Sequence, residues 1–310
     1  MKTAKTLPQP KVTAIVLTWN SADFICAALN SLKNSFYPIN ILAIDNDSTD
    51  NTRQLIRKNY PDVEMHNTQT NLGYAGGNNY GIRLALKNRP DYIFILNPDA
   101  EVSKSCVEKL VDRLEAEPRL AAASPMIYYH NSSKIWFAGS WIKWRTGETL
   151  QCGQNTLDDG RYNTQRYTER LNGCAMLIRS TTIARVGLMD ERYFLYYEES
   201  DWSMRFASHG LGNGFQPDAK VWHKVSSSTG GFHGSIYQYY MTRNRLLFVR
   251  KHKPYMLPAV VLLSIHPYIK IITGTQKRSG FKIALMQARV IAKGHLDFFL
   301  CRFGKQVVPN

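Results

Sequence analysis

The stretch DYIFILNPDAEV, Asp91 to Val102, contains a short apolar run that stops abruptly. Residues 92–96 are aromatic, aliphatic or β-branched, which is typical of a buried strand in a parallel sheet. Asn97, Pro98 and Asp99 follow at once, and Pro98 cannot continue a central strand. We therefore expect Asp99 just beyond the carboxyl end of a strand, where open α/β sheets bind ligands.

A carboxylate at that place can hold a divalent cation against a diphosphate. Mg²⁺ and Mn²⁺ favour oxygen ligands and share them with substrate phosphates. The alternative is a surface turn, because Asn, Pro and Asp are common turn formers. The pattern on either side of the stretch favours the first interpretation.

Strands alternate with helices along the residues that precede Asp91. The pattern predicts strands at Val12–Thr18, 40–45, 63–66 and 92–96. It predicts three helices, the first at 22–34, the second passing through Ile56 and the third ending near Lys87. This alternation predicts the α/β class, with a Rossmann-like, mostly parallel sheet flanked by helices. Such a sheet suits a nucleotide. However, no G-x-G-x-x-G follows the first strand and no P-loop motif occurs, so dinucleotide oxidoreductases and P-loop enzymes are not supported.

Polar residues and glycines follow the second strand. Asp45 and Asn46 could read the edge of a base and a ribose through carboxylate and amide hydrogen bonds, or could belong to a capped turn. Gly73 and Gly77 could give simple loop flexibility, or could let the backbone approach a sugar or phosphate. Tyr74, Trp141 and Trp144 could each stack on a pyranose or lie in the core.

The second half of the chain contains a dense acidic segment. Glu198, Glu199 and Asp201 precede a helix that contains Trp202, and the helix dipole alone could explain acids at that end. One of these carboxylates could instead act as a general base. His223 follows a short strand at 219–222 and is either structural or a metal ligand.

Other candidates in this half are less specific. Gly173 would let an acceptor approach the backbone, and Cys174 reads as a small hydrophobe in a loop entering a buried strand at 171–178. Residues 226–231 read as a mobile loop that could close over donor phosphates. Arg243, in a helix beginning near Ser235, could stabilise diphosphate charge or be solvated.

The net charge of +15 is concentrated at the end of the sequence. Residues 241–310 hold thirteen Lys and Arg and one acid, which gives +12. A basic tail on a nearly neutral body predicts contact with an anionic surface, either membrane lipid or nucleic acid. The five cysteines form no CxxC, and the apolar run at 12–19 is too short for a signal peptide, so we expect a cytoplasmic protein.

The tail itself has amphipathic character. Tyr255 to Ile269 carries no formal charge but is too short to span a bilayer, so it reads as interfacial or re-entrant. In the following helix an apolar stripe is flanked by Lys282, Arg289 and Lys293, which fits a helix lying in anionic headgroups. The alternative is a helix packed on its own domain. The stripe consists of Phe281, Leu285, Ala288, Ala292 and Phe299.

Several motifs together resemble the inverting family 2 glycosyltransferases of the GT-A fold, and most of all their rhamnosyltransferase-like branch. The motifs are Thr-Trp-Asn after the first strand, IDNDSTD, NLGYAGGNNYGI, ILNPDAEV, NGCAMLIR, LYYEESDWSMR and VWHK, and the resemblance runs from about residue 12 to 250. This sequence departs from the DxD element of the family, because Asn97 stands at its first position, and it has Glu199 where most relatives have Asp.

The resemblance implies roles for individual residues. It implies that Glu199 is the catalytic base, with Glu198 and Asp201 positioning the acceptor and loop, and that Asp99 and His223 hold Mg²⁺ or Mn²⁺. Donor-binding residues would be Thr18, Asn20, Asp45, Asn46, Gly73, Gly77, Asn78, Asn97 and Arg243, and acceptor-binding residues would be Gly173, Cys174 and Trp202.

The resemblance also implies the organisation and the reaction. We expect an N-terminal extension at 1–11, a GT-A domain at 12–253 with a nucleotide-sugar half (12–125) and an acceptor half (126–253), and a basic amphipathic tail at 254–310. The expected reaction moves a sugar, by preference L-rhamnose from dTDP-L-rhamnose, to a lipid-linked or polysaccharide acceptor in cell-surface glycan synthesis, at the inner membrane face.

The alternatives are transfer from a UDP-sugar by the same mechanism and a non-catalytic nucleotide-sugar or anionic-surface binding protein. A nucleotidyltransferase is disfavoured because the GxGxR element is absent. A nucleic-acid partner is not expected, because the charge lies in an apolar tail without a recognisable nucleic-acid motif.

Overall fold

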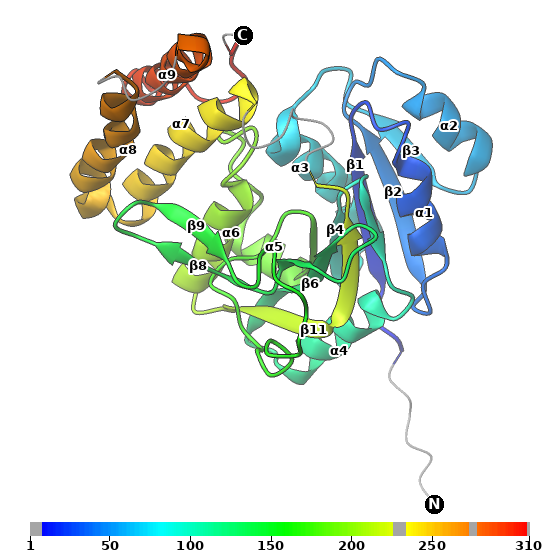
Figure 1. The fold of residues 1–310 in the computed structure, drawn as a ribbon. Coiled ribbons are helices and arrows are strands. Elements are labelled where there is room, and N and C mark those ends of the chain that lie inside the picture. Colours follow the sequence, from blue (N-terminus) through cyan, green and yellow to red (C-terminus); the bar gives the residue numbers. More distant parts are fainter. Residues whose placement is uncertain (1–7, 226–233, 273–277, 309–310) are drawn as a thin grey trace, which may run out of the picture.

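The computed structural model describes residues 8–225, 234–272 and 278–308, without the side chains of 265–284. An α/β body carries a group of C-terminal helices at one side (Figure 1). The loop expected at 226–231 lies outside the described residues.

The first half of the sheet is parallel, as predicted. Strands β1 (Val12–Thr18), β2 (Ile39–Asp45), β3 (Glu64–Asn67) and β4 (Tyr92–Leu96) lie in the order β3-β2-β1-β4. Helices α1 (Ile25–Lys33), α2 (Thr52–Asn59) and α3 (Gly73–Ala85), with a 3₁₀ turn η1 (Leu86–Asn88), connect them. Both β1 and β4 occupy the residues predicted from the sequence, and the carboxyl ends of the four strands meet at one edge.

The second half of the sheet is mixed, so the prediction of a mostly parallel sheet holds only for the first half. Strand β10 (Ala175–Arg179) runs antiparallel to both β4 and β6 (Leu120–Tyr129), while β11 (Gly212–His223) is parallel to β6. Strand β5 (Ala100–Val102) pairs antiparallel with β11, and β7 (Ile135–Phe137) with β6. Because Ala175 pairs with Leu96, the loop before β10 meets the loop after β4.

Helices cover both faces of the sheet. In β4, Phe94 contributes to one apolar core with α1 and α4 (Cys106–Ala116), and its neighbour Ile93 to a second core with α3, α5 (Ser180–Val186) and α6 (Glu198–Ser208). All five residues of β4 are buried. Each such apolar side chain contributes roughly 1.5–3 kcal/mol, so β4 is fixed firmly beneath the loop that carries Asp99.

The C-terminal helices pack on one another and on the short hairpin β8 (Ser140–Lys143) and β9 (Glu148–Gln151). They are α7 (Ser235–His252), a 3₁₀ turn η2 (Pro254–Met256), α8 (Leu257–Ile272) and α9 (Arg278–Phe299). Helix α9 buries Val290 and Phe298, whereas Leu285 and Phe299 of the predicted stripe are exposed. None of the described helices is long and apolar enough to cross a membrane.

Candidate functional site

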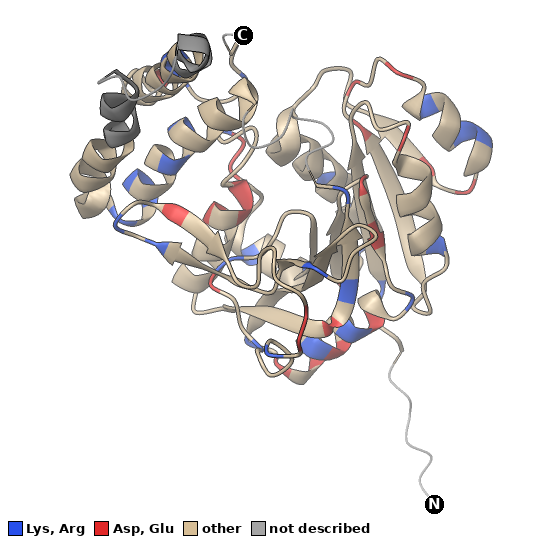
Figure 2. Ribbon diagram, viewed as in Figure 1, with Lys and Arg blue, Asp and Glu red and all other residues tan. Residues whose placement is uncertain are grey.

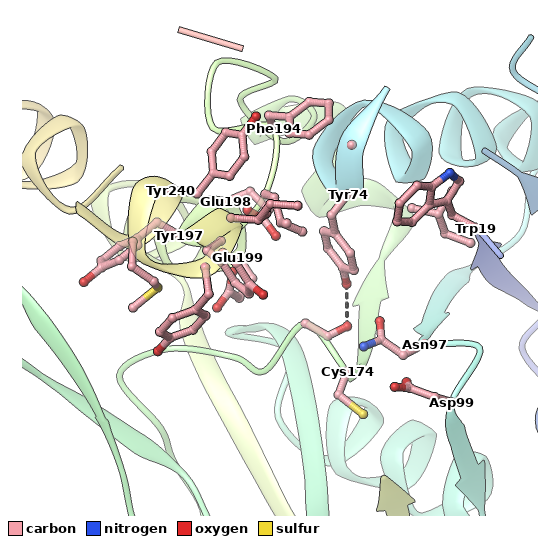
Figure 3. A pocket seen from close by; sticks show the side chains of 18 of the residues that line it. Trp19, Tyr74, Asn97, Asp99, Cys174, Phe194, Tyr197, Glu198, Glu199 and Tyr240 are labelled. Atoms are coloured by element: carbon pink, nitrogen blue, oxygen red, sulfur yellow. Dashed lines mark hydrogen bonds between the residues drawn. The ribbon is translucent and has the colours of Figure 1, made fainter. Parts of the chain in front are cut away.

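A cavity of about 1050 Å³ opens at the carboxyl ends of β1, β2 and β4. Its walls also include the start of α6, the start of α7 and residues 305, 306 and 308 near the end of the described chain. Figure 3 shows that Trp19 and Tyr74 lie on one side, Glu198 and Glu199 on the other, and Asn97, Asp99 and Cys174 at the base between them. This is the edge at which the sequence predicts a ligand site.

Asp99 and His223 contact each other although they are far apart in the sequence. The antiparallel pairing of β11 with β5 sets His223 opposite Ala100, and His223 Nε2 lies 3.1 Å from Asp99 Oδ1. Burial by itself would lower the pKa of His223. The neighbouring Cys174 and Asp99 have a larger, opposite effect, so the pKa of His223 rises above its usual value to about 10. The two side chains therefore form a buried ion pair at the cavity wall.

Once a cation displaces the proton of His223, the pair offers two of the donor atoms that Mn²⁺ accepts, a carboxylate oxygen and an imidazole nitrogen. His223 Nδ1 is buried and has no hydrogen-bond partner among the described residues. No group of three or more metal-binding side chains occurs within the described part of the chain. The residues present thus fit a cation held by two protein ligands and otherwise by oxygens of a bound diphosphate.

Gly173 and Cys174 line the cavity beside this pair. The backbone N–H of Asn97 donates to Cys174 O (2.8 Å), which joins the loop after β4 to the loop before β10. The Tyr74 hydroxyl donates to Gly173 O. Burial raises the pKa of the Cys174 thiol, against the opposite effect of the neighbouring His223. Cys174 is therefore a small buried side chain, as the sequence predicts.

Glu199 lies at the opposite wall and is held by Arg170. Arg170 Nη1 donates to Glu199 Oε1 at 2.7 Å, and the two side chains are 5% and 13% exposed. Both line the cavity. The contact fixes one oxygen of the carboxylate, and no hydrogen bond of Glu199 Oε2 occurs among the described residues.

Glu198 differs from its neighbour. It is 4% exposed, lines the cavity, and its Oε2 has no hydrogen-bond partner among the described residues. Burial, followed by the charge of Glu199, raises the pKa of Glu198 well above its usual range. Two adjacent carboxyls therefore face the cavity in different environments, Glu198 in one that favours its neutral form and Glu199 paired with Arg170.

The turn that leads into α6 has an unusual backbone. Phe194, Tyr196 and Tyr197 have φ angles of 64°, 68° and 72°, in the left-handed region that ordinary side chains rarely adopt. Asn244 on α7 donates from its side-chain amide to Leu195 O and Tyr196 O, both at 2.8 Å. Such strain persists only where surrounding contacts hold it, and it positions the first turn of α6 at the cavity.

Arg243, next to Asn244 on α7, helps to hold the backbone before α6 and does not line the cavity. It is fully buried, and its guanidinium donates to the carbonyls of Arg192 (3.0 Å), Tyr193 (2.9 Å) and Gly304 (2.7 Å). The structure thus places Arg243 behind the wall, where its donors are used by the backbone.

Asp201 is another predicted residue that does not line the cavity. Its fully buried carboxylate accepts from Arg205 Nε (2.9 Å), Lys251 Nζ (2.9 Å) and His252 Nε2 (2.8 Å). Burial raises its pKa, but His252 and Lys251 outweigh that effect and lower it below the usual value. Asp201 therefore ties α6 to α7. The adjacent Trp202 is buried in the core, where its indole donates to Gly187 O (2.8 Å).

On the nucleotide side, Asn20, Asn46 and Gly73 line the cavity. The Asn46 amide donates to Gly73 O (3.1 Å) and accepts from Leu72 N (2.9 Å), so it holds the loop before α3. Gly73 has a φ of 72°, and a Cβ there would lie 2.3 Å from Phe194 O, so only glycine fits.

Four other residues predicted to bind the donor lie behind this wall. Thr18 and Asp45 are fully buried, and Asp45 Oδ2 accepts from Ser48 N (3.1 Å). Gly77 packs against Leu17, and the Asn78 amide donates to Tyr74 O (3.0 Å) inside α3. They shape the loops that face the cavity without lining it.

Sequence reasoning missed Arg170, Trp19 and Trp136, which line the cavity. Trp19 could have been found from the sequence, because it lies in the Thr-Trp-Asn motif after the first strand. Arg170 gives no local signal, since its partner is 29 residues away. Of the aromatic residues weighed for sugar stacking, Tyr74 lines the cavity, Trp144 stacks on Phe248 and Trp141 is half exposed elsewhere.

Solved structures of glycosyltransferases share this fold. The mannosyltransferase PcManGT from Pyrobaculum calidifontis, in complex with GDP-Man and Mn²⁺, matches with a TM-score of 0.57 and 16% identity over 95% of this chain and 88% of its own. TarS of S. aureus in complex with UDP-GlcNAc matches with a TM-score of 0.55 and 16% identity over 93% and 80%. The GT-A fold and the C-terminal helical extension are thus confirmed.

Sequence relatives and a family profile agree with the fold. The N-acetylglucosaminyl-diphospho-decaprenol L-rhamnosyltransferase of Mycobacterium tuberculosis (strain CDC 1551 / Oshkosh) is 28% identical, over 62% of this chain and 69% of its own. The dTDP-rhamnosyl transferase RfbF of Shigella flexneri is 25% identical, over 72% and 74%. The profile described as "Glycosyl transferase family 2" matches residues 13–179, more than half of the chain, so this protein belongs to glycosyl transferase family 2.

Proposed function

We propose that this glycosyltransferase transfers a sugar from a nucleotide sugar to an acceptor hydroxyl with inversion at the anomeric carbon. The observation that carries the proposal is the Glu199 carboxylate, which Arg170 holds at 2.7 Å and which lines the same cavity as Asp99 and His223. Figure 3 shows Glu199 and Asp99. A base on one wall and a diphosphate site on the other suit a single displacement.

In the proposed step, Glu199 accepts the proton of the acceptor hydroxyl. The acceptor oxygen forms a bond to the anomeric carbon from the face opposite the nucleoside diphosphate, and the bond from that carbon to the diphosphate oxygen breaks. Arg170 keeps one carboxylate oxygen fixed, which leaves the other for the hydroxyl. Glu198, being neutral, can donate a hydrogen bond to a sugar oxygen.

Asp99 and His223 would hold Mg²⁺ or Mn²⁺, with Mn²⁺ suited to the imidazole ligand. The cation supplies positive charge to the leaving diphosphate. The presence of Mn²⁺ in the PcManGT structure supports this assignment. Asn97 replaces one carboxylate of the DxD element, so we expect the cation to bind together with the nucleotide rather than tightly before it.

The favoured donor is dTDP-L-rhamnose, supported by the names of the two relatives. The favoured acceptor is a lipid-linked saccharide at the inner face of the cell membrane, as the diphospho-decaprenol relative suggests. Transfer from a UDP-sugar by the same mechanism is the second candidate, because thymine and uracil present the same imide edge.

Nucleoside diphosphate release tests the reaction. The protein is incubated with a panel of nucleotide sugars and membrane extract, and the products are detected by mass spectrometry. We expect dTDP release that depends on the extract. A Glu199→Gln variant should lower turnover by about 10²–10⁴ while donor binding stays nearly constant. Ordinary turnover in that variant would refute Glu199 as the base.

Isothermal titration tests the donor separately. We expect dTDP to bind more tightly than UDP in the presence of Mn²⁺, and equal or reversed affinities would remove the argument for rhamnose. Nucleotide binding without release under any of these conditions would favour the remaining alternative, a non-catalytic nucleotide-sugar or anionic-surface binding protein.

A further inference from the structure

The outer side of the C-terminal helices bears large apolar side chains that touch little of the described protein. Tyr255 and Leu262 are each 72% exposed, and Phe299 is 59% exposed. Leu262 and Phe299, from different helices, line one shallow apolar hollow together with Leu257, Pro258 and Val261. We call this set, with Leu296 and Leu300, the α8/α9 surface; the last two are 54% and 50% exposed.

A contiguous apolar surface of this kind on a protein marks a contact site. The buried sides of these helices are already used, because Val260 of α8 and Phe298 of α9 pack into the apolar cluster that contains Leu247 of α7. Leu257 and Val261 also pack against that cluster, whereas the exposed side chains of the α8/α9 surface are additional to what the helices need for their own packing.

Cations occur in the segments next to this surface. The Arg250 guanidinium lies 4.8 Å from the centre of the Phe298 ring, the Lys253 ammonium lies 6.0 Å from that of Tyr255, and the Arg302 side chain is 60% exposed. Figure 2 shows basic residues along α7, while residues 257–264 of α8 include no charged side chain.

Acids are lacking here. Residues 254–310 contain one carboxylate side chain, Asp297. It is fully buried and accepts from Tyr239 Oη (2.6 Å) and Lys293 Nζ (2.7 Å). Arg302 Nη1 also lies 3.9 Å from Asp297 Oδ1. The surface thus combines exposed hydrocarbon with an excess of positive charge over negative charge.

This combination of exposed hydrocarbon and positive charge favours one kind of binding partner. A second copy of the chain would bring the same cations face to face, which disfavours a symmetric dimer. A polyanion such as nucleic acid would use the cations but leave the apolar hollow uncovered. An anionic bilayer offers hydrocarbon and negative headgroups within the same few ångströms.

The α8/α9 surface is also connected to the cavity. Beyond Leu300 the chain turns back, Gly304 N donates to Arg192 O (2.8 Å), and Gln306 and Val308 line the cavity. A lipid surface that contacts α8 and α9 therefore lies a short segment of chain away from the place where an acceptor would enter.

We propose that the α8/α9 surface rests on an anionic phospholipid bilayer, with Leu262 and Phe299 among the acyl chains and Arg250, Lys253 and Arg302 among the headgroups. The proposal deepens the proposed function by naming the contact that would bring a lipid-linked acceptor to the cavity. It rests on that function only for the acceptor, since the contact itself needs neither donor nor acceptor.

Vesicle co-sedimentation tests the contact with the full chain and no substrate. Vesicles contain phosphatidylcholine alone or mixed with phosphatidylglycerol, in about 0.1 M and about 1 M salt, where the Debye length falls from roughly 10 to 3 Å. We expect binding to the phosphatidylglycerol vesicles that weakens at high salt. The double variant Leu262→Gln, Phe299→Gln should bind at least about tenfold more weakly. Arg302→Gln should bind about fivefold more weakly.

The matched control is Phe36→Gln, because Phe36 is 71% exposed outside the C-terminal helices. It should bind vesicles like the original protein, and thermal unfolding should show that every variant is folded. Absence of binding by the original protein, or equal binding by the double variant, overturns the proposal. A concentration-dependent dimer in light scattering that the double variant abolishes would instead assign the surface to a second copy. Failure of transfer with intact vesicle binding would count against the proposed function alone.

Discussion

Three carboxyl groups within four residues of α6 have three different environments. Glu198 is buried without a hydrogen bond to its Oε2 among the described residues, Glu199 is paired with Arg170, and Asp201 is surrounded by cations behind the wall. A sequence of acids at the start of a helix cannot distinguish these cases, because the helix dipole favours all of them. The difference arises from partners that other elements bring.

Arg170 should matter for turnover more than for donor binding. Arg170→Ala removes the donor to Glu199 Oε1 and leaves the carboxylate free to rotate. We expect kcat to fall by about 10- to 100-fold, with the donor dissociation constant nearly unchanged, since misplacement of a reacting group has effects of this size. Stopped-assay kinetics and titration with dTDP measure the two quantities.

The control is Arg170→Lys, which keeps a cation but offers a single point of contact. It should recover part of the lost kcat. If Arg170→Ala and Arg170→Lys reduce the unfolding temperature equally and kcat only in proportion to the folded fraction, Arg170 has a structural role alone.

Asp99 should couple the cation to the diphosphate. Removal of divalent cations with a chelator should abolish transfer, and Mn²⁺ or Mg²⁺ should restore it, because the leaving group otherwise lacks a neutralising charge. Asp99→Ala should abolish turnover and reduce the gain in dTDP affinity that Mn²⁺ gives to the original protein. Full transfer in excess chelator would show that no cation takes part.

Much of this site follows from the sequence at the level of single residues. The run before Asn97 fixes the place of Asp99, and the acids at 198–199 reach the cavity as expected. Asp201 and Arg243 lie outside the cavity lining, where they contact residues about 50 positions away along the chain. Local patterns carry no information about such partners, so the same patterns could not reveal Arg170.

At the scale of elements, α7 supports the cavity from behind. Its Asn244 and Arg243 bind the carbonyls of the left-handed turn, and its Lys251 and His252 bind Asp201 on α6. The first turn of α6, which carries Glu199, is therefore fixed from both sides. The strands before residue 97 could be predicted to within a residue or two because their apolar pattern is regular. The direction of β10 could not, since it depends on where a long loop segment returns to the sheet.

The ion pairs of Asp201 predict a pH-dependent contribution to stability. Because its folded-state pKa lies below the unfolded value near 3.9, the contribution is present above that value and is lost as the pH falls through the folded pKa. Asp201→Asn should lower the free energy of unfolding at neutral pH by about 3–5 kcal/mol, the usual effect of breaking a buried pair. Denaturant unfolding between neutral and acidic pH measures this.

The difference between the original protein and Asp201→Asn should shrink as the pH drops below about 4. A difference that stays constant down to the most acidic pH at which both proteins fold would mean that the lost hydrogen bonds, rather than the charge, are responsible. Glu101→Gln is a suitable control, because Glu101 is a partly exposed acid on β5 whose cationic partner, Lys224, lies 3.9 Å away.

At the scale of the whole molecule, the C-terminal region both contacts the catalytic body and presents the α8/α9 surface. The sequence predicts an amphipathic tail, and in the structure Leu285 and Phe299 of the predicted stripe are exposed on α9 whereas Val290 and Phe298 are buried. Periodicity alone cannot say which side of a helix meets protein and which meets solvent when both sides contain apolar residues. Deletion of all residues from 254 would therefore remove packing, cavity wall and exposed surface at once.

A shorter deletion separates these roles. Removing residues 304–310 leaves α8 and α9 intact but takes away the hydrogen bonds of Gly304 with Arg192 and Arg243, and the cavity lining at Gln306 and Val308. We expect unchanged binding to phosphatidylglycerol vesicles and a fall in kcat/KM of about tenfold or more with a detergent-dispersed acceptor, because one wall of the cavity is open to water. Arg302→Gln in the full chain is the converse control, with weaker vesicle binding and unchanged kcat/KM toward the same acceptor. Equal loss of both properties in the two variants would mean that the tail cannot be divided in this way, and that its contacts with the body and with the bilayer form a single cooperative unit.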